Sequence, residues 1–152
     1  MGTWDVGPFD NDTAADWCGD LDDAAPEQRA ASIRDALSRV AEHGADYLDS
    51  DDAVEAIAAA AIVASQLPGG TAIDSAYAPH FVLEGGRVDV ADDVPAIAVR
   101  ALDRIVGDDS EWRALWQEAG EAYPQALASV QSIRATLERA ISRRAAAGHG
   151  TR

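Results

Sequence analysis

The architecture of this chain is set by the stretch Val54-Glu-Ala-Ile-Ala-Ala-Ala-Ala-Ile-Val-Ala-Ser65. It is apolar on almost every side after Glu55, and a helix without a polar face is buried by its neighbours. Its alanines let other helices approach closely. Acids at positions 49–52 can cap the helix, and Pro68-Gly-Gly70 can end it. We therefore expect a central buried helix over residues 54–67, surrounded by other helices.

Two helices are expected before this stretch. Asp10, Asn11 and Asp12 are N-cap residues ahead of residues 13–18, and Gly19 can end that short helix. Pro26 suits the first turn of the next helix, whose apolar residues recur at helical spacing. These apolar residues are Ala30, Ile33, Leu37 and Val40.

Three helices are expected after it, beginning near Asp93, at Asp109 or Ser110, and at Pro124. Between the third and fourth helices lies an irregular loop, in which residues 81–90 could form a small hairpin around two glycines. The fold class is therefore all-α, a compact bundle of five to six helices. We expect a single helical domain over residues 1–144 and a mobile tail over residues 145–152.

Five short pieces of sequence carry a family resemblance. Met1-Gly-Thr-Trp4, Gly7-Pro-Phe-Asp-Asn-Asp12 and Ala15-Asp-Trp17 stand at the start, and Gln66-Leu-Pro-Gly-Gly70 and Leu102-Asp-Arg104 follow later. In these pieces the chain resembles a small bacterial family that is named only as a domain of unknown function, DUF4259. The resemblance extends over most of the chain. It implies no catalytic or binding residue, because none is established for the family.

The opening segment supplies the candidate interaction residues. They are Trp4, Phe9, Asp10, Asn11, Asp12, Asp16 and Trp17. We expect the three aromatic side chains to be mostly buried, because burial of each is worth about 1.5–3 kcal/mol. The acids do not form an EF-hand, which needs Gly at the sixth loop position and Glu at the twelfth. Counted from Asp10, those positions hold Ala15 and Leu21, so we predict helix capping, no tight metal site and no cofactor.

No other catalytic pattern is found in the sequence. His43, His80 and His149 stand singly and lack the spacing of a zinc site. Cys18 is the single cysteine, which excludes an intrachain disulfide, and a free cysteine is usually a small buried apolar residue. A chemical role for His80 or Cys18 stays open, since sequence spacing cannot place a partner beside either.

The net charge of −15 is unevenly distributed. Residues 1–28 carry acids and no base, whereas residues 129–152 are rich in arginine. Acidic chains repel phosphates and anionic lipids, so we expect neither nucleic acid nor a membrane as a partner. Acids near the turn between the first two helices could be relieved by arginines of the last helix, within one chain or between two copies. The acids are Asp20, Asp22, Asp23 and Glu27, and the arginines are Arg134, Arg139, Arg143 and Arg144.

Three classes of function follow from these features. The start of the chain lacks the pattern of a signal peptide, and no apolar run approaches the ~20 residues that span a bilayer, so a soluble cytoplasmic protein is expected. The favoured function is a non-enzymatic interaction or regulatory protein with a basic partner, such as an immunity protein that meets a toxin. The alternatives are a metal-dependent enzyme that uses the N-terminal carboxylates and a self-associating structural protein, for example a homodimer.

Overall fold

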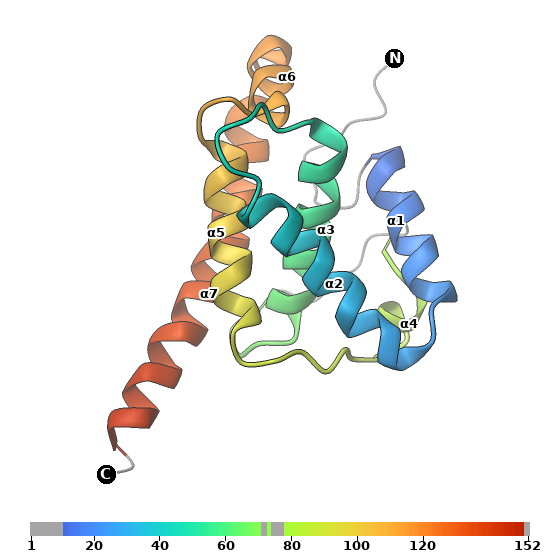
Figure 1. Ribbon diagram of the computed structural model, residues 1–152, viewed down its shortest axis with the longest axis vertical. Coiled ribbons are helices and arrows are strands. Elements are labelled where there is room, and N and C mark those ends of the chain that lie inside the picture. Colours follow the sequence, from blue (N-terminus) through green and yellow to red (C-terminus); the bar gives the residue numbers. More distant parts are fainter. Residues whose placement is uncertain (1–10, 71–72, 74–77, 151–152) are drawn as a thin grey trace.

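The alanine-rich stretch forms helix α3 (Ser50–Ser65), and every residue from Ala56 to Ala64 is buried. The computed structural model describes residues 11–70, 73 and 78–150, and α3 runs through the middle of the bundle (Figure 1). It packs against α1, α2, α5, α6 and α7. The expectation of a central buried helix is confirmed, because α3 has no polar face to offer to water.

The helices are α1 (Asp12–Asp23), α2 (Pro26–Ala41), α3 (Ser50–Ser65), α4 (His80–Leu83), α5 (Val94–Val106), α6 (Glu111–Ala119) and α7 (Tyr123–Gly150). The described residues therefore form an all-α fold of seven helices, as expected in class and with the short α4 beyond the expected count. Helices α2 and α5 cover one side of α3, and α7 runs along α5 and extends past the other helices (Figure 1). No helix in the described ranges has the length and hydropathy needed to cross a membrane.

Three of the expected helix caps are confirmed. The side chain of Asn11 accepts a hydrogen bond from the backbone N–H of Ala14 at 2.8 Å, and Asp49 and Ser110 cap α3 and α6 in the same way. Asp93 precedes α5 without capping it, because its carboxylate instead accepts two hydrogen bonds from the guanidinium of Arg34 in α2. The cap is lost to an ion pair with a residue far away in the sequence.

One expected boundary is wrong. Gly19 does not end the first helix, since α1 continues through it to Asp23. Residues 145–150, part of the expected mobile tail, form the last turns of α7, and their mobility stays a prediction. Residues 145–147 are alanines, which favour helix formation. A single glycine such as Gly19 costs a helix only about 1 kcal/mol, so α1 can continue through it.

The hairpin expected over residues 81–90 is wrong. Its first residues belong to α4, and the described part of this segment forms no strand. The reason lies in α1, where the carboxylate of Asp22 accepts hydrogen bonds from the backbone N–H groups of His80 at 2.8 Å and Phe81 at 3.1 Å. These bonds satisfy the free donors at the start of a helix, so they favour a helical turn over a hairpin.

Candidate functional site

Helix α1 carries a line of four aspartates on its outer side. The intervals of four, four and three residues place these side chains on one face of the helix, and all are exposed or half-exposed. We call them the α1 aspartate face: Asp12, Asp16, Asp20 and Asp23. The opposite side of α1 is buried in the core through Ala14, Cys18 and Leu21. The packing of α1 therefore fixes the direction in which the acids point.

The α1 aspartate face forms no ion pair within the described residues, although the guanidinium of Arg29 lies against the last turn of α1, where it donates to the carbonyls of Leu21 at 3.0 Å and Asp22 at 2.8 Å. None of its four carboxylates takes part in an ion pair or a side-chain hydrogen bond within the described residues. The helix contains no basic residue. At a rise of 1.5 Å per residue, the face spans about 16 Å from Asp12 to Asp23. The four carboxylates therefore form a line of negative charge along the whole length of α1.

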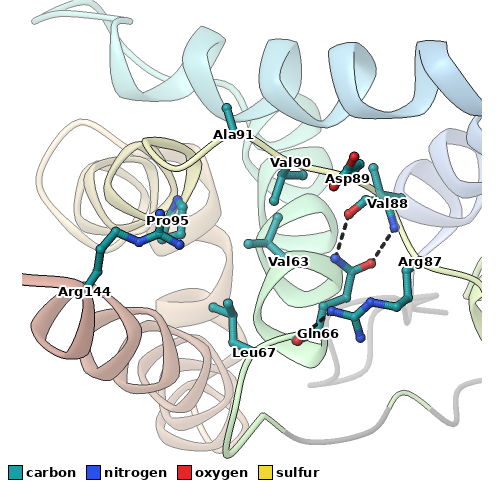
Figure 2. A pocket seen from close by; sticks show the side chains of 10 residues that line it. All are labelled: Val63, Gln66, Leu67, Arg87, Val88, Asp89, Val90, Ala91, Pro95 and Arg144. Carbon is teal, nitrogen blue, oxygen red and sulfur yellow. Dashed lines mark hydrogen bonds between the residues drawn. The ribbon is translucent and has the colours of Figure 1, made fainter. Parts of the chain in front are cut away.

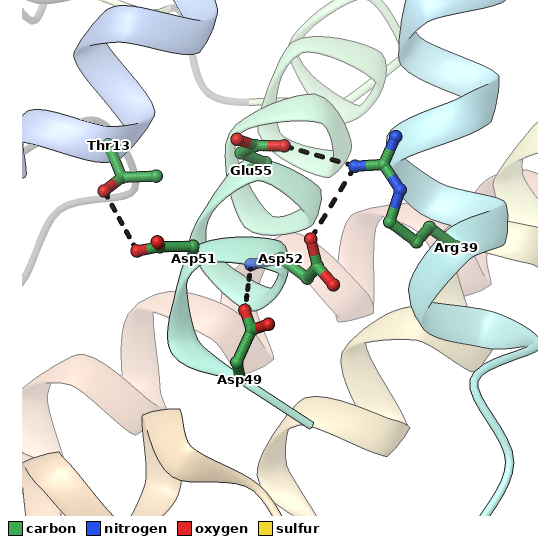
Figure 3. Close-up of polar contacts among 6 residues, drawn as sticks. All are labelled: Thr13, Arg39, Asp49, Asp51, Asp52 and Glu55. Carbon is green, nitrogen blue, oxygen red and sulfur yellow. Dashed lines mark hydrogen bonds and ion pairs between the residues drawn. The ribbon is translucent and has the colours of Figure 1, made fainter. Parts of the chain in front are cut away.

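The neighbouring acids at the start of α3 are engaged, in contrast. Figure 3 shows that Asp49 accepts a hydrogen bond from the backbone N–H of Asp52 at 2.9 Å, so that it caps α3. Asp51 accepts a hydrogen bond from the hydroxyl of Thr13 at 3.1 Å, which joins α3 to the start of α1. These acids hold the first and third helices in place, and they extend the acidic surface beyond Asp12.

Helix α2 contributes a cation to the same region. The guanidinium of Arg39 lies 3.7 Å from the carboxylate of Asp52 and 3.4 Å from that of Glu55 (Figure 3). Burial raises the pKa of the Glu55 carboxyl above its ordinary value, and the charge of Arg39 offsets part of that effect. Arg39 therefore balances the inner acids of α3 and leaves those of α1 unbalanced.

The expected relief of the N-terminal acids by the last helix is not found within the described chain. Arg134 of α7 donates to the carboxylate of Asp103 in α5 at 2.7 Å, and Arg144 pairs with Asp92 just before α5. The two ion pairs lie where α7 meets α5 and not at α1. The arginines are thus used to attach α7, because α5 is the helix that α7 packs along.

The expected candidate residues have different fates in the structure. Asn11 is buried as the cap of α1, Asp12 and Asp16 belong to the α1 aspartate face, and Trp17 is accessible on one side and packs against the core on the other. The remaining candidates, Trp4, Phe9 and Asp10, lie outside the described residues, so the burial expected for the first two stays a prediction.

Cysteine and histidine chemistry gains no support from the geometry. Burial, and to a lesser degree the nearby charge of Asp22, raises the pKa of the Cys18 thiol to about 12. A thiol that stays protonated at neutral pH is a poor nucleophile and metal ligand. His43 Nε2 lies 3.1 Å from the carbonyl oxygen of Tyr47, and His80 is exposed at the start of α4. Within the described residues, no group of three or more His, Cys, Asp or Glu side chains could hold a metal ion.

A small pocket of about 290 Å³ lies at the other end of α3 (Figure 2). Its walls are the end of α3, the extended residues 87–91, the start of α5 and Arg144. The side chain of Gln66 forms one wall, since it donates to the carbonyl of Val88 at 2.9 Å and accepts from the N–H of the same residue at 2.7 Å. Arg87 donates to the carbonyl of Gln66 at 3.0 Å. The arginines that line the pocket are thus engaged by the protein itself.

Two residues in a later piece of the family resemblance, Leu102 and Arg104, stabilise the fold. The guanidinium of Arg104 donates to the carbonyls of Gly44 at 3.1 Å, Asp46 at 2.6 Å and Asp108 at 2.9 Å. It also donates to the carbonyl of Asp109 at 3.3 Å. It thereby joins the loop after α2 to the loop after α5. Leu102 is buried in the core. Sequence reasoning missed this role, because the four carbonyls come from two loops that only the fold brings together.

A comparison with known protein families found a match. The family model of DUF4259, described as a domain of unknown function, matches residues 2–129. The chain belongs to the DUF4259 family. The match includes α1 with its aspartates, and it ends within the first turns of α7, so most of that helix lies outside the DUF4259 match. No curated protein and no solved structure matches the chain.

Proposed function

We propose that this DUF4259 protein is a non-enzymatic cytoplasmic interaction or regulatory protein, whose α1 aspartate face binds a basic surface of a partner protein. The observation that carries the proposal is the line of four accessible aspartates that form no ion pair within the described residues. An immunity protein that covers a basic toxin is one example of such a pair. The enzyme alternative has no comparable observation in its favour.

Electrostatics explains why such a face suits a basic partner. Like charges on one helix repel one another and destabilise it, so an unrelieved line of acids has a cost in the free protein. A partner that brings lysines or arginines removes the repulsion and gains attraction, and it also associates faster. Each exposed ion pair contributes roughly 0.2–1 kcal/mol. Four of them at about 0.5 kcal/mol each total about 2 kcal/mol, which corresponds to a change of roughly thirtyfold in the dissociation constant.

A cross-linking experiment tests the proposal in the cell. A photo-reactive amino acid is placed at Gly19, which is exposed on α1 and where an added Cβ would meet no atom within 4 Å. The same probe at Gln117, exposed on α6, is the control. We expect a defined adduct with a basic protein from position 19 and none from position 117. No adduct from position 19, or the same adduct from both positions, would contradict the proposal.

Two substituted proteins separate the face from the overall charge. The α1 neutral variant removes the four carboxylates of the face: D12N, D16N, D20N and D23N. The matched control variant removes four accessible carboxylates elsewhere: D35N, D46N, E118Q and E121Q. Both variants have the same net charge, so only a local effect distinguishes them. We expect the adduct at position 19 to be lost in the first variant and retained in the second.

A further inference from the structure

The pocket at the end of α3 combines apolar walls with two cationic side chains. Val63, Leu67 and Pro95 supply apolar surface, and the first and last of these are themselves buried. Figure 2 shows Arg87 and Arg144 on either side of Val63 and Leu67. A concave site with apolar walls and a few placed polar groups is the usual form of a small-molecule site.

One wall of the pocket is fixed by the protein itself. The side-chain amide of Gln66 donates to the backbone carbonyl of Val88 at 2.9 Å and accepts from its N–H at 2.7 Å. These two bonds hold the extended residues 87–91 beside the end of α3. A ligand does not have to order this wall when it binds, and a site formed in advance lowers the entropic cost of binding.

Both guanidinium groups keep hydrogen-bonding capacity for a ligand. A guanidinium has five N–H donors. Within the described residues, Arg87 uses one nitrogen to donate to the carbonyl of Gln66, and Arg144 uses one nitrogen in its ion pair with Asp92. The side chains of Arg144 and Asp92 are 57% and 83% exposed, and such exposed pairs contribute little to stability. A ligand carboxylate can therefore share Arg144 with Asp92.

The lining of the pocket favours a ligand with a single negative charge. Arg87 and Arg144 line it together with one acid, Asp89. A planar carboxylate matches the fork of a guanidinium, and apolar walls suit a hydrocarbon body. The pocket volume of about 290 Å³, at about 30 Å³ for each water-sized unit, corresponds to roughly ten non-hydrogen atoms.

We propose that this pocket binds a small monocarboxylic acid with a hydrocarbon body. Arg87 and Arg144 hold the carboxylate, and the hydrocarbon lies against Val63, Leu67 and Pro95. The inference goes beyond the interaction proposed for α1, since no residue of the α1 aspartate face lines the pocket. Because the walls come from α3, α5 and α7, a bound acid connects the ends of these three helices.

An NMR titration of the isotope-labelled full chain with octanoate tests the proposal, and octanamide is the neutral comparison. We expect octanoate to shift the backbone amide signals of residues 66–67 and 87–91 saturably, with a dissociation constant of about 1 mM or below. Octanamide should bind at least about tenfold more weakly. The net charge of −15 repels the acid, so a preference for octanoate requires the local arginines.

Variants assign the binding to the arginines of the pocket. R87Q/R144Q removes both charges, and R100Q/R113Q removes the same charge from two arginines that do not line the pocket. We expect octanoate to bind at least about tenfold more weakly to the first variant and within about threefold of wild type to the second. V90F keeps both arginines and fills the pocket, so it should lose binding as well.

The outcomes that overturn the proposal are distinct from those that test the α1 face. No saturable shift at the pocket amides, equal affinity for octanoate and octanamide, or equal affinity of the two arginine variants would each overturn it. The amide spectrum of each variant shows whether the chain is folded. If R87Q/R144Q does not fold, V90F decides, and octanoate binding that survives in V90F overturns the proposal. None of these results touches the basic partner, which the cross-link at position 19 tests independently.

Discussion

Two glycines show how differently one residue type is used in this chain. Gly19 lies within α1, and a Cβ added there would meet no atom within 4 Å. Gly70 follows α3, and a Cβ added there would lie 2.0 Å from the carbonyl oxygen of Ala64. The first glycine is a weak point of a helix, whereas the second permits a close backbone approach that any side chain would prevent.

Alanine at these two positions should therefore act in opposite directions. G19A removes the entropic cost of glycine in a helix and should raise the free energy of unfolding by about 0.5–1 kcal/mol. G70A forces the turn after α3 apart and should lower it by roughly 1–3 kcal/mol. Urea unfolding followed by circular dichroism measures both. Effects of the same sign would show that one of the two environments is described wrongly.

Glu55 should make stability depend on pH. Because burial raises its pKa in the folded chain, the folded state holds this proton more tightly than the unfolded state does. Its contribution to stability is therefore present below the ordinary glutamate pKa of 4.5 and is lost as the pH rises through the raised pKa. In E55Q that loss is absent, so the stability of the variant relative to wild type should increase from pH 4 towards neutrality. A constant difference across this range would contradict the expectation.

At the level of helices, the sequence predicts what depends on local pattern. The burial of α3 follows from its lack of a polar face, and the caps at Asn11 and Asp49 follow from side chains that reach their own helix. The errors arise where a distant residue competes. The carboxylate of Asp93 accepts a hydrogen bond from Arg34 and therefore does not cap α5. The carboxylate of Asp22 in α1 accepts a hydrogen bond from the backbone N–H of His80, which favours α4 over the expected hairpin. Such competitors become visible only once the helices are packed.

The candidate site was predictable in part for the same reason. The spacing of the aspartates along α1 is visible in the sequence, and an accessible acidic line follows from it once the helix extends through Gly19. The engagement of Asp22 with α4 and of Asp51 with Thr13 was not predictable, because each depends on a contact between distant elements. The sequence therefore could not separate the acids that hold the fold from those that are free.

Close packing around α3 predicts a strong response to added volume. Ala59 is fully buried at the centre of the bundle, whereas Ala31 is exposed on α2. A59L should lower the free energy of unfolding by about 1–3 kcal/mol, because the surrounding helices must move apart. A31L is the control and should change it by no more than about 0.5 kcal/mol. Equal effects in a urea titration would show that α3 is not the close-packed centre.

Over the molecule as a whole, charge is the dominant feature. The 27 acids outnumber the 12 arginines, and the described ion pairs involve α2, α3, α5, α6 and α7 and leave α1 without one. Self-repulsion of this kind destabilises the compact state, and salt screens it. The same imbalance leaves the α1 aspartate face without an ion pair within the described residues.

The stability of the free chain should therefore rise with salt. We expect the urea midpoint to increase between about 0.01 M and 1 M sodium chloride, as the interaction range falls from about 30 Å to about 3 Å. The α1 neutral variant should respond less than wild type, because it lacks four of the repelling charges. A midpoint that falls with salt would show instead that attractive ion pairs dominate.

The dissociation constant of the partner captured at position 19 is the most direct test of the role of α1. Titration calorimetry near 0.1 M salt compares wild type with the α1 neutral variant and the matched control variant, which have equal net charge. We expect the α1 neutral variant to bind roughly tenfold or more weakly, and the matched control variant to stay within about threefold of wild type. Equal affinity of the two variants would contradict the assignment of α1 as the binding face.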